Sequence, residues 1–133
     1  MSRVLDPWRD ARDIAALLSK EGTLLVVMLG AEQWCARCRA LRPIFDALAA
    51  QRHENEAWLW LDLEDHADFI GDDLPDNLPV LMAYRGNCLV LSQALATETV
   101  AIRALVDAAR SAPPAGLSDP GIRARLLVAD WAQ

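Results

Sequence analysis

The sequence predicts an α/β fold in which a mixed central β-sheet carries helices on both faces, followed by a C-terminal helical extension. Apolar runs of strand length alternate with segments of helical periodicity. The continuous run at 24–29 (Leu-Leu-Val-Val-Met-Leu) is typical of a strand covered on both faces. Two further runs lie close together across turn residues, which adds an antiparallel hairpin to the sheet.

The length and composition indicate a compact protein. With 133 residues the chain can bury one core, and we expect a domain at 1–111 followed by a linker and helical extension at 112–133. The net charge of −6 argues against nucleic acid or an anionic membrane as a partner. We find neither a signal peptide nor the roughly 18 apolar residues of a membrane span, and therefore expect a cytoplasmic protein.

The first half of the chain predicts the order helix, strand, helix, strand. Residues 9–20 place apolar side chains three and four positions apart, and the apolar strand follows at 23–29. Residues 35–51 again have one apolar face, and Pro43 inside this helix is expected to kink it, because proline removes one backbone hydrogen bond. Residues 57–63 alternate tryptophan and leucine and predict the second strand.

The second half of the chain predicts a hairpin between helices. A short acidic helix is expected at 64–71, and strands at 80–84 and 88–91 are joined by the turn residues Arg85-Gly86-Asn87. A helix at 97–110 then completes the domain.

The C-terminal segment begins with a proline-rich linker at 111–116 and continues as a short helix at about 119–131. This helix either packs back on the domain or presents an apolar stripe to another protein. Both alternatives stay open at this point.

The motif Trp34-Cys35-Ala36-Arg37-Cys38 lies at a predicted strand-to-helix junction. Its two thiols are close enough to form a small disulfide, and the first sulfur lies where the amino end of a helix favours a thiolate. The total of three cysteines argues against a structural disulfide framework, which leaves catalysis or metal binding for the pair. A zinc site needs four ligands and only one cysteine pair exists, so we expect no metal and no other cofactor.

These residues at these spacings resemble the thioredoxin family over roughly residues 10–110. The apolar strand leads to the cysteine motif, Pro43 follows Cys35 by eight positions and Pro79 follows it by forty-four. The family has a helix proline and a cis-proline at these two places. The resemblance implies the thioredoxin fold and a thiol–disulfide oxidoreductase that exchanges disulfides with protein substrates and is recycled by a reductase or thiol donor.

The resemblance also implies roles for individual residues. Cys35 would be the exposed nucleophile, and Cys38 the resolving thiol. Pro79 would be cis, and the backbone of Leu78 would pair with an extended substrate peptide. Trp34 would shape the substrate groove or pack against the domain. Considered without the family, Cys38 also fits an inert core residue, and Pro79 a trans turn proline.

Ala36 and Arg37 occupy the tuning positions between the cysteines. The charge of Arg37 would favour the thiolate of Cys35 and raise the reduction potential above the value of about −270 mV of thioredoxin. The alternative is that Arg37 is a solvated surface residue. Leu29 and Trp60 stand where family members often bury an acid and a lysine, an exchange that removes a proton acceptor for the second sulfur.

A binding function is the alternative to redox catalysis. Some thioredoxin-fold proteins are binding or assembly chaperones, including hydrogenase-maturation accessory proteins that have lost redox activity. A solvated helix face is the favoured interpretation of the acidic stretch at 62–76, and a docking surface for a basic partner is the alternative. Cys88 is expected to be a core or edge-strand residue that takes no part in the chemistry.

Overall fold

The computed structural model describes residues 4–6, 9–20, 22–31, 33, 35–53, 55–63, 78–95, 102–111 and 121–127. The predicted acidic helix at 64–71 and all but the first residue of the predicted linker at 111–116 lie outside these ranges. The described elements are α1 (Ala11–Leu18), β1 (Leu24–Gly30), α2 (Ala36–Ala49), β2 (Glu56–Asp62), β3 (Val80–Arg85), β4 (Cys88–Ala94), α4 (Ile102–Arg110) and α5 (Ile122–Leu126).

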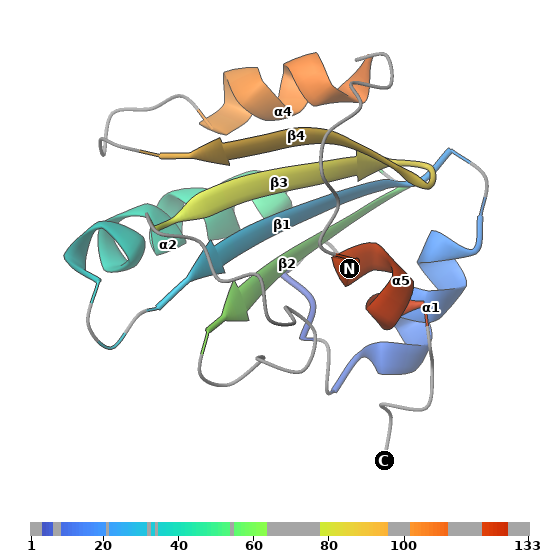
Figure 1. Cartoon of the computed structure of the whole chain (residues 1–133), viewed down its shortest axis with the longest axis horizontal. Coiled ribbons are helices and arrows are strands. Elements are labelled where there is room, and N and C mark those ends of the chain that lie inside the picture. The colour runs from blue at the N-terminus through green and yellow to red at the C-terminus, as the bar shows by residue number, and fades with distance from the viewer. Residues whose placement is uncertain are drawn as a thin grey trace.

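The four strands form one mixed sheet in the order β2-β1-β3-β4 (Figure 1). β1 pairs parallel with β2 and antiparallel with β3, and β3 and β4 form the predicted antiparallel hairpin. Gly86 takes a φ of +60° in the hairpin turn, a conformation that glycine adopts without steric cost. The predicted α/β class with a mixed sheet is confirmed. Among the described residues, no helix is long and apolar enough to span a membrane.

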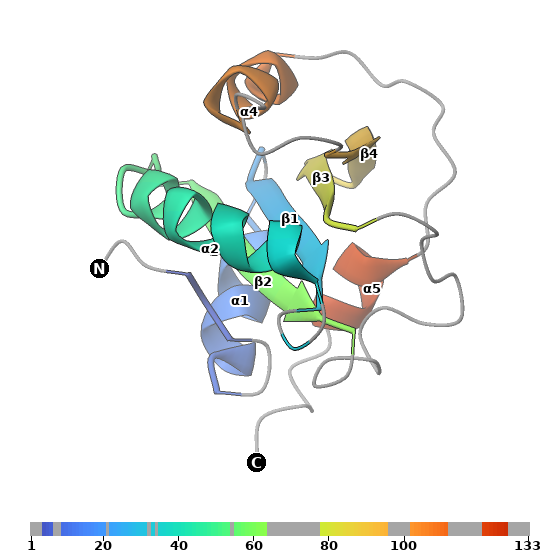
Figure 2. The same cartoon turned by 90° about the vertical axis from the view of Figure 1, so that its left-hand side faces the viewer.

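Helices cover both faces of the sheet (Figure 2). We call the two apolar clusters the α1/α5 core and the α2/α4 core, after the helices that contribute to them. Every residue of β1 is buried, and its side chains alternate between the two cores. The α1/α5 core takes Leu25, Val27 and Leu29 from β1, together with Leu59 and Leu61 from β2. The α2/α4 core takes Val26 and Met28 from β1, together with Cys38, Phe45, Trp58 and Trp60.

The terminal segments of the described chain pack onto the sheet layer. Ile122 and Leu126 of α5 are buried in the α1/α5 core, and Arg123 Nη2 donates a hydrogen bond to the Leu18 carbonyl at 2.9 Å. Of the two alternatives for the C-terminal helix, the described part thus packs back on the domain. At the other end, the Leu5 N–H donates to the Trp58 carbonyl at 2.9 Å, and Leu5 forms a parallel bridge with Leu59.

A buried ion pair joins β2 to α4. The Glu56 side chain is only 2% exposed and accepts from Arg110 Nε at 2.6 Å and from Arg110 Nη2 at 3.0 Å. It also accepts from Trp58 Nε1 at 3.1 Å and from the His53 N–H. Burial alone would raise the pKa of Glu56, but these donors together lower it. The pair therefore fixes α4 against the start of the sheet.

Candidate active site

Cys35 caps the amino end of α2. Its backbone is extended, with φ −113° and ψ 104°, and its Sγ accepts a hydrogen bond from the Cys38 N–H at 3.2 Å. This is the bond that serine or aspartate makes at the start of a helix, here made by a sulfur. The Cys35 N–H donates in turn to the Ala31 carbonyl at 3.0 Å, which ties the site to the end of β1. Cys35 is half-buried and therefore reachable, as expected for an attacking thiol.

Cys38 lies one helical turn further on and is fully buried. Burial raises the pKa of the Cys38 thiol to about 11, and the hydrogen bond and charge of Cys35 act in the same direction. The Ala31 backbone and the charge of Arg37 oppose the rise without cancelling it. At neutral pH the second sulfur of the pair is therefore a protonated thiol.

The ends of β1 and β2 form the surface on which Cys38 rests. Met28 pairs in register with Trp60, and both lie in the α2/α4 core with Cys38. Leu29 points into the α1/α5 core on the other side of the sheet. The expectation that Leu29 stands where an acid would serve the second sulfur is therefore wrong, because Leu29 faces away from Cys38 and Trp60. Met28 is the residue beside Trp60 on the Cys38 face.

Gly30 completes this surface by having no side chain. A β-carbon at this position would lie 2.6 Å from Cζ2 of Trp60 and 3.3 Å from Sγ of Cys38. The indole of Trp60 thus occupies the space beside the second sulfur. By strand alternation Asp62, the register partner of Gly30, lies on the same face of β2 as Trp60, at the end of the strand opposite Glu56. Sequence reasoning missed Asp62, because only the register reveals its place.

The Leu78–Pro79 peptide bond is cis, which confirms the expectation for Pro79. Leu78 is 8% exposed and belongs to the α2/α4 core with Cys38. Arg37 Nη1 donates to the Leu78 carbonyl at 3.5 Å and to the Leu95 carbonyl at 3.3 Å. The Arg37 side chain therefore reaches across to the Leu78–Pro79 segment. No sequence pattern signals a contact between residues 41 and 58 positions apart.

The two remaining predicted site residues are Ala36 and Trp34. Ala36 is the exposed first residue of α2, between the cysteines. Trp34 lies outside the described residues. Cys88 is half-buried at the start of the edge strand β4, and its Sγ donates to Asn87 Oδ1 at 3.5 Å. Within the described ranges, no group of three or more histidine, cysteine or acidic side chains could hold a metal ion.

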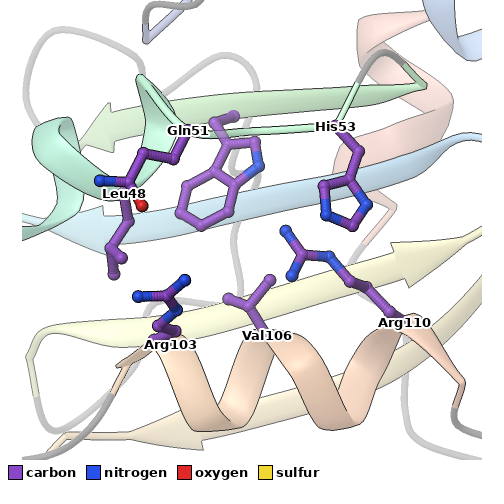
Figure 3. A pocket seen from close by; sticks show the side chains of 7 residues that line it. Leu48, Gln51, His53, Arg103, Val106 and Arg110 are labelled. Carbon is purple, nitrogen blue, oxygen red and sulfur yellow. The ribbon is translucent and has the colours of Figure 1, made fainter.

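A small cavity between α2 and α4 lies away from the cysteines (Figure 3). Its volume of about 50 Å³ holds a few water molecules at most, whereas ligand pockets measure several hundred Å³. The Arg110 guanidinium faces His53 across it, but Arg110 is already paired with Glu56. The lining residues are Leu48, Gln51, His53, Trp58, Arg103, Val106 and Arg110. This cavity is therefore too small for a ligand of ordinary size.

The arrangement of strands, helices and cysteine pair is that of a thioredoxin fold. A chain of the complex between ferredoxin:thioredoxin reductase and thioredoxin f2 superposes with a TM-score of 0.60 and 20% identity, over 83% of this chain and 97% of that chain. Schistosoma mansoni thioredoxin gives 0.59 and 19% identity, over 80% and 91% of the two chains. Chlamydomonas reinhardtii thioredoxin f2 gives 0.56 and 18% identity, over 85% and 99%.

The sequence comparisons are weaker than the structural ones. The chain is 29% identical to mouse (Mus musculus) thioredoxin domain-containing protein 2 over 77 residues, which are 58% of this chain and 15% of that protein. The chain thus matches only a small part of the length of this relative. No family model matches the chain.

Proposed function

We propose that the protein is a cytoplasmic thioredoxin-like thiol–disulfide oxidoreductase that exchanges disulfides with protein substrates through Cys35 and Cys38. The observation that carries the proposal is the hydrogen bond from the Cys38 N–H to the Cys35 sulfur at the amino end of α2. It ties the reachable sulfur of Cys35 to the backbone of Cys38, whose own sulfur is buried within the same helical turn. The helix terminus stabilises negative charge on the first sulfur, which makes it the better nucleophile.

The reaction proceeds in two exchanges. The Cys35 thiolate attacks one sulfur of the substrate disulfide, so the substrate S–S bond breaks and its other sulfur leaves as a thiolate that takes a proton from water. Cys38 then loses its proton to water and attacks Sγ of Cys35. The Cys35–Cys38 disulfide forms and the second substrate thiol leaves. The substrate gains two electrons and the pair loses two.

Other residues would hold the substrate and tune the sulfurs. The backbone of Leu78, before Pro79, would pair with the extended substrate peptide, and Trp34 would border the groove. Arg37 and Ala36 would set the electrostatics between the cysteines. The burial of Leu78 and Cys38 in the same α2/α4 core supports this assignment.

A reductase or a thiol donor would return the disulfide to the dithiol. The support comes from the structural neighbour that was solved in a complex of ferredoxin:thioredoxin reductase with thioredoxin f2. That complex concerns the neighbour, and for this chain it indicates the class of recycling partner only.

The test is a disulfide-reduction assay with purified variants and dithiothreitol as reductant. We expect Cys35→Ser to abolish protein-catalysed exchange. Pre-reduced Cys38→Ser, mixed with the substrate after the dithiothreitol has been removed, should accumulate mixed disulfides that are visible on non-reducing gels. Cys88→Ser is the matched control and should keep wild-type turnover. Full activity of the Cys35→Ser variant would exclude the proposed function.

A binding or assembly-chaperone function is the competing candidate. Met28 and Trp60, the register partners on the Cys38 face, are both apolar and offer Cys38 no proton acceptor, which supports this candidate. A redox titration with thiol trapping separates the two. A reversible two-electron transition supports the oxidoreductase, whereas a pair that forms no disulfide in any redox buffer supports the binding function.

A further inference from the structure

Arg37 differs from Arg42 and Arg110 in what holds it. Arg42 pairs with Asp46, and Arg110 pairs with Glu56 and Asp107. Arg37 donates instead to two backbone carbonyls, and among the described residues no carboxylate pairs with it. A carbonyl oxygen carries only a partial negative charge, so it compensates little of the positive charge of the guanidinium. This charge lies at an exposed position beside Cys35.

The charge around Arg37 is also positive, although the whole chain is acidic. The helix α2 contains Arg37, Arg39 and Arg42 against the single acid Asp46, which gives three positive charges minus one negative, or +2. No acid lies in its first turn, and the helix terminus adds a positive partial charge. The helix that begins at the reactive sulfur is therefore positively charged, whereas the net charge of the whole chain is −6.

The hydrogen bonds of Arg37 leave room for a substrate. A carbonyl oxygen has two lone pairs, so the Leu78 carbonyl can accept from Arg37 and also from a substrate backbone N–H. The guanidinium has five N–H donors, of which Nη1 carries two, so the three on Nε and Nη2 have no partner among the described residues. These donors have the fork geometry that binds a carboxylate through two parallel bonds.

From this geometry we infer that Arg37 is a specificity-determining residue that binds an acidic side chain next to the reactive cysteine of the substrate. The inference rests on the proposed function and names its substrate class: disulfides flanked by aspartate or glutamate. The two carbonyls hold the guanidinium beside Leu78 before the substrate arrives, which reduces the entropy lost on binding. The chemical step is the exchange described above, and the carboxylate takes no part in bond making.

The experiment compares three synthetic peptide disulfides that differ only in the residue after cysteine, which is glutamate, glutamine or lysine. Pre-reduced protein reacts with each in a single turnover that is quenched with acid, so the protein dithiol supplies both electrons. We expect the glutamate peptide to react about three- to fivefold faster than the glutamine peptide, as one exposed ion pair allows, and the lysine peptide to be slowest. The ratio should fall towards one in about 1 M salt.

Variants test whether Arg37 causes the ratio between the rates of the glutamate and glutamine peptides. Arg37→Gln should reduce it to about one, and Arg37→Lys should keep part of it, because an ammonium cannot form the fork. Arg39→Gln removes the same charge from an exposed position two residues further along α2 and should lower the ratio much less than Arg37→Gln, because it leaves the fork of Arg37 in place. A wild-type ratio of one, or a ratio that survives Arg37→Gln, would overturn the inference.

Binding of redox-inert peptides separates this inference from the proposed function. Peptides with serine in place of cysteine are titrated into the wild-type protein and the Arg37→Gln variant by NMR. Tighter binding of the glutamate peptide by wild type alone supports the role of Arg37 even if no peptide is reduced. Equal affinities for the two peptides would refute it even if every peptide is reduced.

Discussion

The indole of Trp60 lies against the backbone of Gly30, with Cζ2 only 2.6 Å from the place where a β-carbon would be. Both residues are close to the buried sulfur of Cys38, so the contact fixes the surface on which the second thiol rests. Real β-carbons do not approach ring atoms this closely. Any larger residue at position 30 must therefore displace Trp60 or the end of β1.

Gly30→Ala should accordingly destabilise the protein by about 1–3 kcal/mol, the usual cost of an overpacked core. The free energy of unfolding from urea titration measures it. In a Trp60→Leu background the added methyl group has space, so the same substitution should cost clearly less. Equal costs in the two backgrounds would show that the Gly30–Trp60 contact is not the cause.

The thiol of Cys38 should titrate at high pH. Its pKa is raised to about 11 mainly by burial, so absorbance at 240 nm of the reduced Cys88→Ser protein should show its last thiol step near pH 11. The folded state holds the proton more tightly than the unfolded chain, whose thiol has a pKa of about 9.0. The contribution of the protonated Cys38 thiol to the free energy of unfolding is therefore complete below pH 9 and is lost as the pH rises through about 11.

A Cys38→Ser variant in the same background supplies the control for this titration and should lack the last step. If the step stays, it belongs to another group. A complete thiol titration below pH 9 in the reduced protein would contradict the burial argument and would make Cys38 a ready resolving thiol at neutral pH.

The Glu56–Arg110 pair should dominate the stability of the α4 attachment. Arg110→Met leaves a buried carboxylate without its main partner, which costs about 3–5 kcal/mol of unfolding free energy. Combining it with Glu56→Gln should recover much of this loss, because no buried charge then lacks a partner. Additive losses in the double variant would contradict the coupling.

The same pair predicts a pH dependence of stability at acid pH. The pKa of Glu56 in the folded protein is below its ordinary value of about 4.5, so the unfolded chain binds the proton more tightly. The stabilisation is therefore complete above pH 4.5 and is lost as the pH falls through the folded pKa. Glu56→Gln should flatten the decline in melting temperature below pH 4.5, and an unchanged slope would exclude Glu56 as its source.

The C-terminal helix should contribute to the core. Ile122 is fully buried, so Ile122→Ala should lower the unfolding free energy by about 2–4 kcal/mol. Ala124→Ser, at an exposed position of the same helix, should change it by less than about 0.5 kcal/mol. A similarly small effect of both substitutions in urea titrations would show that α5 is not needed for folding.

Local patterns in the sequence predicted the architecture. The apolar runs predicted all four described strands, and the spacing from Cys35 to Pro79 predicted the cis bond. These features depend on neighbouring residues or fixed spacings, which a sequence displays directly. β4 continues to Ala94 although the predicted strand ends at 91. Its last three residues are exposed and do not extend the apolar run, and yet they remain paired with β3.

The contacts that shape the candidate site are not local, and the sequence did not reveal them. Which face Leu29 and Met28 take depends on where β1 ends relative to the cysteines, and a spacing cannot fix this. The Arg37–Leu78 and Glu56–Arg110 contacts join residues 41 and 54 positions apart. Such pairs of charged and backbone groups leave no periodic signal, and they become visible only when the sheet brings their elements together.

The bridge between Leu5 and Leu59 covers part of the outer edge of β2. An uncovered strand edge offers its N–H and C=O groups to any other chain, which is a common route to aggregation. The residues before α1 thus protect this part of the strand edge from pairing with another chain. Variants shortened past Leu5 should lose this protection and become less soluble, although every cysteine stays in place.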